Sequence, residues 1–325
     1  MNAYDILARP GVLRREEIPA SMTVPTRNRS SRFQLPSFGR FKNYLTQLPS
    51  NLYSILRIPA AEGRTAVFWA YLKNSARLAV SGVFPAIAPR AVRIRGATIR
   101  LLDYASFLGL FIEIFVRREY RFAFDSPSPL ILDCGSNIGV SVAYFKTTFP
   151  GSRIIAFEPD ELAFAILQEN VKANHWEGIE LHHAALDSRD GEIDFFFDPS
   201  IPGSVIMSTL EHRVRGAEGR VTARRTVRAL RLSSFVTEPV DLVKMDIEGA
   251  ELCVMEDLAQ TGKLLMIKQI VLEYHHHLSA EENRLARLLA LLEEHGFGYQ
   301  IHAPCARPFR RRDFQDMLIY AYRPA

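Results

Sequence analysis

The sequence is poor in the features that mark secreted, membrane-spanning and disulfide-linked proteins. Its 325 residues include only three cysteines, whose wide spacing matches neither a disulfide framework nor a zinc site. No uncharged apolar run reaches the roughly 18 residues of a transmembrane helix. The first residues also lack the apolar core of a signal peptide. These absences predict a cytoplasmic chain without a transmembrane segment.

A strong charge imbalance is also absent. Lys and Arg number 40 against 36 Asp and Glu, so the formal net charge is only +4. The basic stretches "TARRTVRALR" and "RPFRRRD" contain few aromatic residues that could stack on bases, so we expect no nucleic-acid partner. Such arginines could instead attract an anionic substrate, because guanidinium groups bind phosphate well.

Composition divides the chain into three parts. Residues 1–50 are rich in Arg, Ser and Pro and are predicted to form a basic, poorly ordered extension. Residues 51–114 hold helical patterns and no motif of known role. Residues 115–325 are predicted to form the main domain, because strands and amphipathic helices alternate regularly from about residue 129 onward. The sequence leaves open whether identical chains form an oligomer.

The alternation of strands and helices predicts an α/β fold with a doubly wound, Rossmann-like and mostly parallel sheet. The segments "FGYQIHA" and "DMLIYAYRP" close the chain without a helix between them, which predicts an antiparallel hairpin at one edge. Residues 192–198 and 220–230 are predicted to pair as additional strands. The main strands are expected at 130–134, 153–159, 179–186, 240–246 and 268–275.

A loop rich in small residues follows the first of these strands. In "ILDCGSNIGVSVAYF" the apolar run stops at Asp133, and Gly135, Asn137 and Gly139 precede a helix. Such a loop brings backbone close to a ligand, and the free N–H groups of the following helix suit an anion or a carboxylate. It is no Walker loop, because Gly-Lys-Ser/Thr is missing, and Asn137 replaces the middle glycine of G-x-G-x-x-G.

Glu158 ends the second strand, where a carboxylate can accept the two hydroxyls of a ribose. The loop and Glu158 together indicate a nucleoside-containing cofactor, but they do not separate NAD from S-adenosylmethionine. The fourth strand does, because "LVKMDIEGAE" gathers Asp246, Glu248 and Glu251 at its end. Clustered carboxylates favour a cofactor with positive centres, such as a sulfonium and an amino group, over hydride transfer.

These motifs together resemble the FkbM-type methyltransferases, a family of class I enzymes that depend on S-adenosylmethionine. The resemblance rests on "DCGSNIG", "FEPD", "HHAAL" followed by "DGEI", "LVKMDIEGAE" and "VLEYH", and it covers roughly residues 115–323. It implies that Glu158 holds the ribose, that Asp246 faces the methionine amino group, and that the turn from Ala185 to Asp187 borders the adenine. The cofactor-binding residues expected on this basis are Asp133, Gly135, Asn137, Gly139, Glu158, Ala185, Asp187 and Asp246.

The predicted activity is therefore that of a transferase, an O-methyltransferase acting on a hydroxyl of a small molecule, a sugar or glycan, or a secondary metabolite. Glu248, Glu251 and His275 are the candidates for the general base, because they lie at the ends of the fourth and fifth strands. Residues 275–277 are all histidines, but neighbours on a strand point to opposite sides, so no zinc site is predicted there. A divalent metal at Asp246 and Glu248 is left open, although the chain has no dedicated oxygen-ligand loop. Two alternatives stay open: an NAD-dependent oxidoreductase or epimerase, and a non-catalytic cofactor-binding protein.

Overall fold

The computed structural model describes residues 38–83, 89–197, 222–276, 284–303 and 315–324. The chain falls into two compact units, Met1–Leu45 and Thr46–Ala325. Most of the predicted basic extension lies outside the described residues, and the three domain boundaries expected from the sequence stay predictions. All the elements discussed below lie in the second unit, except that α2 begins in the first.

A seven-stranded sheet forms the centre of this unit, in the order β11-β12-β10-β9-β3-β4-β5. The inner strands are parallel, and β12 runs antiparallel to both β10 and β11, which confirms the predicted Rossmann-like sheet with its closing hairpin. From β3 the chain builds first toward β5 and later toward β10, so the strand order reverses between β3 and β9. The strands are β3 (Leu130–Cys134), β4 (Arg153–Phe157), β5 (Ile179–His182), β9 (Leu242–Met245), β10 (Gln269–His276), β11 (Gly298–His302) and β12 (Gln315–Tyr322).

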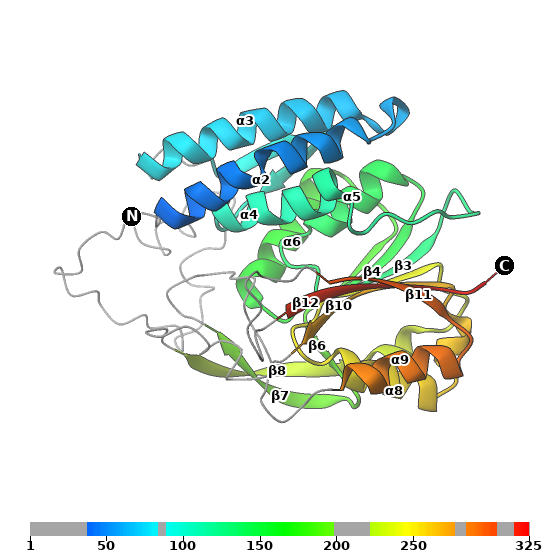
Figure 1. The fold of residues 1–325 in the computed structure, drawn as a ribbon. Coiled ribbons are helices and arrows are strands. Elements are labelled where there is room, and N and C mark those ends of the chain that lie inside the picture. Colours follow the sequence, from blue (N-terminus) through cyan, green and yellow to red (C-terminus); the bar gives the residue numbers. More distant parts are fainter. Residues whose placement is uncertain (1–37, 84–88, 198–221, 277–283, 304–314, 325) are drawn as a thin grey trace. The chain divides into compact units, whose positions relative to one another are not determined.

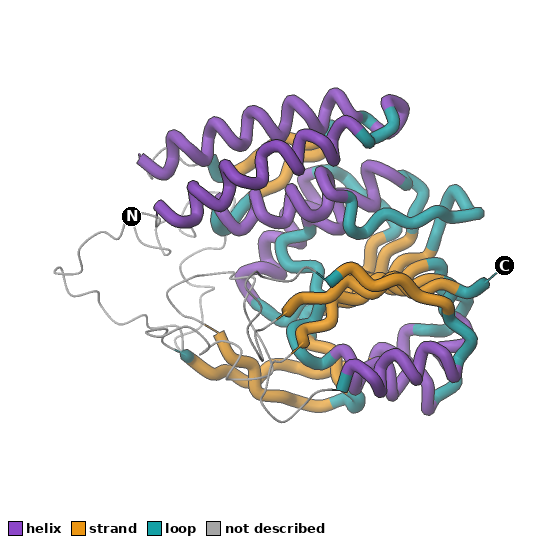
Figure 2. Tube along the Cα trace, viewed as in Figure 1, coloured by secondary structure: helices purple, strands orange, loops and turns teal. Residues whose placement is uncertain are grey.

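Helices cover both faces of the sheet, as Figures 1 and 2 show. On one face lie α5 (Val140–Thr148) and α6 (Glu161–Ala173), and on the other lie α8 (Glu251–Gln260) and α9 (Leu285–Glu294). Asp160 stands just before the amphipathic run of α6, where an aspartate is expected to cap a helix. This expectation is confirmed, because its carboxylate accepts the N–H of Ala163 at 2.8 Å. The short 3₁₀ helices η5 (Leu232–Phe235) and η6 (Lys263–Met266) flank β9 along the chain.

An N-terminal layer packs against α5 and α6. Its elements are α2 (Phe38–Leu56), η2 (Ala60–Glu62), α3 (Arg64–Val83), β1 (Ala91–Ile94), β2 (Ala97–Arg100), α4 (Tyr104–Phe111) and the π-helix η4 (Ile112–Arg117). The rings of Phe107, Phe111 and Phe115 stack in a row, and Phe115 meets Tyr144 of α5 edge to face. Because these side chains are buried, the segment of α4 and η4 shares a core with the sheet domain.

A second, three-stranded sheet contains β6 (Ala185–Asp187), β8 (Ala223–Arg231) and β7 (Gly191–Phe197), in that order. The antiparallel pairing of β7 with β8 confirms the expected pair of additional strands. The prediction of one strand over 179–186 is wrong. The N–H of Ala184 turns back onto the carbonyl of His182, so β5 ends there and β6 pairs with β8 instead of β4.

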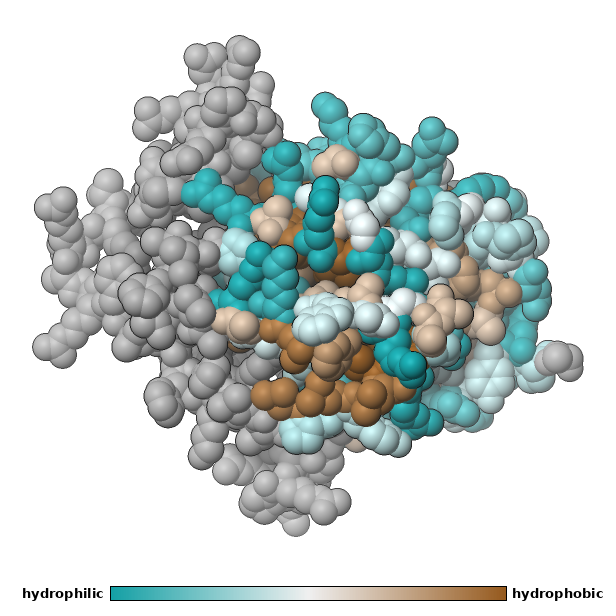
Figure 3. Space-filling view, turned by 90° about the horizontal axis from the view of Figure 1, so that it is seen from above, coloured by the Kyte–Doolittle hydropathy of each residue, from teal (hydrophilic) through white to brown (hydrophobic). Residues whose placement is uncertain are grey.

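The surface carries both polar and apolar side chains. Figure 3 shows apolar residues gathered among polar ones on the face seen from above. The large apolar side chains exposed on α2 and α3 are those of Tyr53, Leu56 and Trp69. Among the described residues, no helix combines the length and the apolar character needed to cross a membrane. The cytoplasmic location stays a prediction.

Candidate functional site

The loop between β3 and α5 lies at the carboxyl ends of the strands, where the strand order reverses. Gly135, Asn137 and Gly139 all have positive φ angles, of 83°, 48° and 86°. A Cβ atom on Gly135 would lie 1.8 Å from the carbonyl oxygen of Asp246, and one on Gly139 would lie 2.6 Å from Leu167 Cδ1. The two glycines therefore let the loop pack against the end of β9 and against α6, in addition to any role toward a ligand.

Glu158 ties this loop to the end of β4. One of its carboxylate oxygens accepts the backbone N–H of Asn137 at 2.8 Å, and the other accepts that of Asp160 at 2.7 Å. Only 5% of the residue is exposed, and burial raises the pKa of its carboxyl group to about 8, with the Asp160 charge adding to the effect. Each oxygen keeps a second lone pair, so the carboxylate can still accept hydroxyl groups.

Lys244 of β9 lies beneath the loop and was not predicted as a site residue. It is only 2% exposed, and its ammonium group donates to the carbonyls of Cys134 at 3.1 Å and Gly135 at 2.6 Å. The same nitrogen lies 3.6 Å from Asp133 Oδ1 and 3.8 Å from Asp246 Oδ2. Burial alone would lower the pKa of Lys244, but the two carboxylates outweigh it and leave that pKa raised. The sequence feature that could have revealed Lys244 is a lysine inside the otherwise apolar strand "LVKM".

Asp133 is completely buried at the end of β3. Its Oδ2 accepts the hydroxyl of Ser141, at the start of α5, at 2.6 Å. Its Oδ1 has no hydrogen-bond partner among the described residues and faces the ammonium group of Lys244. Asp133 thus connects the strand, the helix and Lys244 below the loop.

Asn170 of α6 is a further residue that the sequence reasoning missed. Its amide nitrogen donates to the carbonyl of Ile138 in the loop at 2.8 Å, and its amide oxygen accepts the N–H of Arg100 at 2.7 Å. Asn174, one helical turn later, binds both backbone groups of Thr98 in the same way. These two amides, spaced four residues apart in "ENVKAN", fix strand β2 and the loop to α6.

The predicted catalytic residues come together around His275. Its Nδ1 lies 2.9 Å from Glu251 Oε1, which also accepts the N–H of Gly249 at 2.9 Å. Its Nε2 lies 3.3 Å from Glu248 Oε2 and 3.9 Å from Asp246 Oδ1. Burial lowers the pKa of His275, but Glu248 and Glu251 raise it more, so this pKa lies well above its ordinary value. Burial would raise the pKa of Glu251, but the imidazole keeps it lowered.

Glu248 has an unusual backbone for a non-glycine residue, with a φ of 56°. It is one of the few residues in the described chain with this left-handed conformation, and strained residues cluster at functional sites. The turn directs its side chain toward His275 and leaves 16% of that side chain exposed. Of the two carboxylates, that of Glu248 is therefore the more accessible, because Glu251 is buried.

Additional acids that were not predicted surround this cluster. Glu113 and Glu119 come from the π-helix and the residues after it, and Glu273 and Asp316 come from β10 and β12. Burial, followed by the Glu113 charge, raises the pKa of Glu119 to about 7. Burial, followed by the Asp246 charge, raises the pKa of Glu273 to about 9. Glu273 is two residues before His275, but Glu113, Glu119 and Asp316 lie on segments far from the predicted cluster along the chain, so the sequence hides them.

Ala185 and Asp187, predicted to border the adenine, lie on β6 of the small sheet. Ala185 is buried, and Asp187 Oδ1 lies 3.8 Å from the thiol of Cys253 on α8. The chain just before β6 is linked to the end of β4, because the rings of His182 and Phe157 stack with their centroids 5.1 Å apart. The small sheet therefore continues from the strand end that carries Glu158.

Three of the four arginines in "TARRTVRALR" have carboxylate partners. Arg224 pairs with Asp194 at 3.1 Å, and Arg231 pairs with Asp257 at 2.5 Å. Arg225 pairs with Asp160, which caps α6. The stretch "RPFRRRD" and the segment "DPSIPGSVIMSTLEHRV" between β7 and β8 lie outside the described residues.

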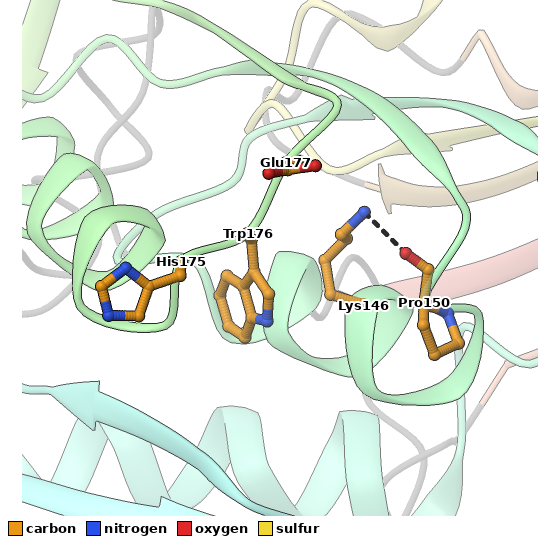
Figure 4. A pocket seen from close by; sticks show the side chains of 5 residues that line it. All are labelled: Lys146, Pro150, His175, Trp176 and Glu177. Carbon is orange, nitrogen blue, oxygen red and sulfur yellow. Dashed lines mark hydrogen bonds between the residues drawn. The ribbon is translucent and has the colours of Figure 1, made fainter.

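A separate hollow lies beside the segments that precede β4 and β5 (Figure 4). Its lining residues are Lys146, Pro150, His175, Trp176 and Glu177. The ammonium group of Lys146 already donates to the carbonyls of Pro150 at 3.0 Å and Ser152 at 2.8 Å. It therefore serves to hold the turn between α5 and β4.

The sheet topology, with acidic residues at the carboxyl ends of its central strands, defines a class I methyltransferase fold. Residues 133–299 match the family model described as the methyltransferase FkbM domain. This chain belongs to the FkbM methyltransferase family. The match favours a methyltransferase over the NAD-dependent alternative that the sequence had left open.

Two relatives and one solved structure illustrate what this chain is similar to. Methyltransferase 1 of Beauveria bassiana is 29% identical over 207 residues, which are 59% of this chain and 81% of the relative. The 31-O-demethyl-FK506 methyltransferase FkbM of Streptomyces tacrolimicus is 26% identical over 251 residues, covering 65% of this chain and 94% of the relative. A solved structure of methyltransferase FkbM from Methylobacillus flagellatus aligns with a TM-score of 0.43 and 16% identity, over 86% of this chain and 60% of the solved chain.

Proposed function

We propose that this chain is an S-adenosylmethionine-dependent O-methyltransferase that acts on a hydroxyl of a sugar, a glycan or a secondary metabolite. The observation that carries the proposal is the set of carboxylates at the switch point, with Glu158 after β4 and Asp246 and Glu248 after β9. When bound, the cofactor supplies an electrophilic methyl group. Support for oxygen as the acceptor comes from the family resemblance and from the relative named for a 31-O-demethyl compound.

The residues at the carboxyl ends of the strands suit this cofactor. A ribose presents two hydroxyl donors, which match the open lone pairs of Glu158. A sulfonium and an α-amino group are positive and match the acids at the strand ends, of which Asp246 is the member proposed for the amino group. Gly135, Asn137 and Gly139 contribute backbone to the methionine side, and Ala185 and Asp187 border the adenine. Asp133, being fully buried, supports the loop through Lys244 and Ser141.

We assign the proton-accepting role to Glu248. Its carboxylate is partly exposed and 3.3 Å from His275 Nε2, so an acceptor hydroxyl can approach it beside the imidazole. Glu251 is committed to Gly249 and to His275 Nδ1, so its proposed role is to orient the histidine. His275 would position Glu248 and the acceptor. A general base of this kind contributes about 10²–10⁴-fold to a rate.

The cofactor assignment is tested by calorimetric titration with S-adenosylhomocysteine. At pH 8.5, where the Glu158 carboxyl is mostly ionised, we expect wild-type binding, and we expect Glu158→Gln to weaken it by about 1.5–3 kcal/mol, because hydrogen bonds to a charged acceptor are lost. Glu180→Gln, an exposed acid on β5, is the control and should bind as the wild type does. Equal affinity of wild type and Glu158→Gln would remove the ribose assignment.

The same titration should depend on pH. Burial raises the pKa of Glu158 to about 8, and only the ionised carboxylate accepts both ribose hydroxyls. Raising the pH from 6.5 to 8.5 removes this proton, so the affinity for S-adenosylhomocysteine should increase by about 20-fold. Glu158→Gln has no such proton and should lose most of this increase.

Glu248→Gln tests the proposed base. Turnover should fall by about 10²–10⁴-fold, because the acceptor hydroxyl loses its proton acceptor. Affinity for S-adenosylhomocysteine should change little. The rate is measured as cofactor product formed with the alcohol that serves the wild type best in a panel of glycosides and other secondary alcohols. Glu256→Gln, on the outer side of α8, is the control, and a Glu248→Gln variant as fast as this control would contradict the assignment.

A further inference from the structure

The pairing of β10 with β12 brings three potential metal ligands onto one face of the sheet. Glu273 and His275 are two residues apart on β10 and therefore point the same way. Asp316 of β12 is the direct partner of His275 in the antiparallel register. One donor atom from each of the three lies within 4.8 Å of the others, and His275 Nε2 is 3.8 Å from Asp316 Oδ1.

The orientation of His275 is fixed by a buried acid behind it. Glu251 holds Nδ1 at 2.9 Å, which turns Nε2 toward Asp316 and the neighbouring carboxylates. Histidines that bind metals are commonly oriented in this way, by a carboxylate on the nitrogen that does not bind the metal. Both strands are paired through their whole length here, so the ligands stand on rigid backbone.

Near these three residues, several side-chain oxygen atoms receive no hydrogen bond from any described residue. Within the described ranges, the carboxylates of Glu113 and Glu273 make no hydrogen bond and no ion pair. The hydroxyl of Tyr120 also has no hydrogen-bond partner there, although this residue is only 6% exposed. The ammonium group of Lys244 lies 5.3 Å from the centroid of the Tyr120 ring and 3.8 Å from Asp246 Oδ2, so Tyr120 lies beside the acidic cluster. Lys244, the buried cation of this region, already donates to two backbone carbonyls.

We propose that Glu273, His275 and Asp316 bind one divalent cation, with the Tyr120 hydroxyl facing the same space. A set of carboxylates with one imidazole suits Mn²⁺. Tyr120 and Asp316 lie outside the residues that match the family model, so this site is a property of the whole chain. The inference rests on the proposed function in one respect: a cation next to Glu248 would hold the acceptor oxygen and make its proton easier to remove.

The test is Mn²⁺ binding by the full chain after treatment with a chelator and without cofactor. Electron paramagnetic resonance measures free Mn²⁺, and calorimetry gives the stoichiometry. We expect one ion per chain in the wild type and at least tenfold weaker binding in Glu273→Gln and in Asp316→Asn. Asp316 is 45% exposed, so its variant should fold normally. Glu251→Gln should weaken Mn²⁺ binding by about 10–100-fold, as is usual for an orienting acid.

Glu180→Gln is again the control and should bind Mn²⁺ as the wild type does. Wild-type protein that binds no Mn²⁺ would overturn the inference, and so would unchanged binding in both Glu273→Gln and Asp316→Asn. Titration of the same samples with S-adenosylhomocysteine separates this result from the proposed function. Cofactor binding without Mn²⁺ binding removes only the cation site, whereas Mn²⁺ binding without cofactor binding removes only the cofactor assignment.

Discussion

Gly135→Ala is expected to abolish binding of S-adenosylhomocysteine and to lower the free energy of unfolding by several kcal/mol. The new Cβ atom would lie 1.8 Å from the carbonyl oxygen of Asp246, far inside contact distance. Neither backbone can retreat easily, because the N–H of Asp246 donates to the carbonyl of Cys134 at 3.1 Å. A positive φ adds about 1–2 kcal/mol for a residue with a Cβ atom. Urea unfolding and calorimetric titration measure the two losses.

Gly96→Ala is the matched control for this variant. Gly96 has a similar φ of 91°, but a Cβ atom there would meet nothing within 4 Å. It should therefore show only the backbone strain of about 1–2 kcal/mol and should keep its cofactor affinity. Equal loss of stability in the two variants would mean that the contact with Asp246 contributes nothing. The difference between them measures that contact directly.

This glycine also shows how far the sequence could predict the site. The spacing of Gly135 and Gly139 after an apolar strand was sufficient to locate the loop, because strand, turn and helix signals are local. The atoms that demand the absence of a side chain belong to Asp246 and Leu167, which lie far along the chain. A single sequence cannot reveal such contacts, so the packing of these glycines within the protein is known from the structure alone, while their role toward a ligand stays a prediction.

The rest of the fold also contains features that the local sequence determines and features that depend on contacts between distant segments. The strand and helix alternation and the cap at Asp160 followed from periodicity and from the residue preferences of helix ends. The break at His182 did not, because β6 leaves the main sheet only to pair with β8, which comes later in the chain. The proximity of Asp246, Glu248 and His275 was predictable, because these residues lie at the ends of adjacent strands. Glu273 could have been predicted too, because it lies two residues before His275 on β10 and points the same way. Asp316 joins them only through the register of β10 and β12.

Lys244→Met is expected to lower the free energy of unfolding by about 3–5 kcal/mol, as is usual when one partner of a buried ion pair is removed. Methionine keeps the apolar contacts of the lysine stem, but the carbonyls of Cys134 and Gly135 lose their donor. Asp133, which has no solvent contact, loses the nearby positive charge and keeps only the hydroxyl of Ser141. Affinity for S-adenosylhomocysteine should fall as well, because the loop is no longer anchored to β9.

Two further variants make this prediction specific to the buried position. Lys268→Met removes a lysine that pairs with Asp241 at 2.7 Å but is half exposed, so it should lower the free energy of unfolding by only about 0–1 kcal/mol. Adding Asp133→Asn to Lys244→Met removes the stranded carboxylate and should restore part of the lost stability, without restoring the loop contacts or the cofactor affinity. If Lys244→Met were no less stable than Lys268→Met, the ammonium group would not be what holds the loop on the sheet.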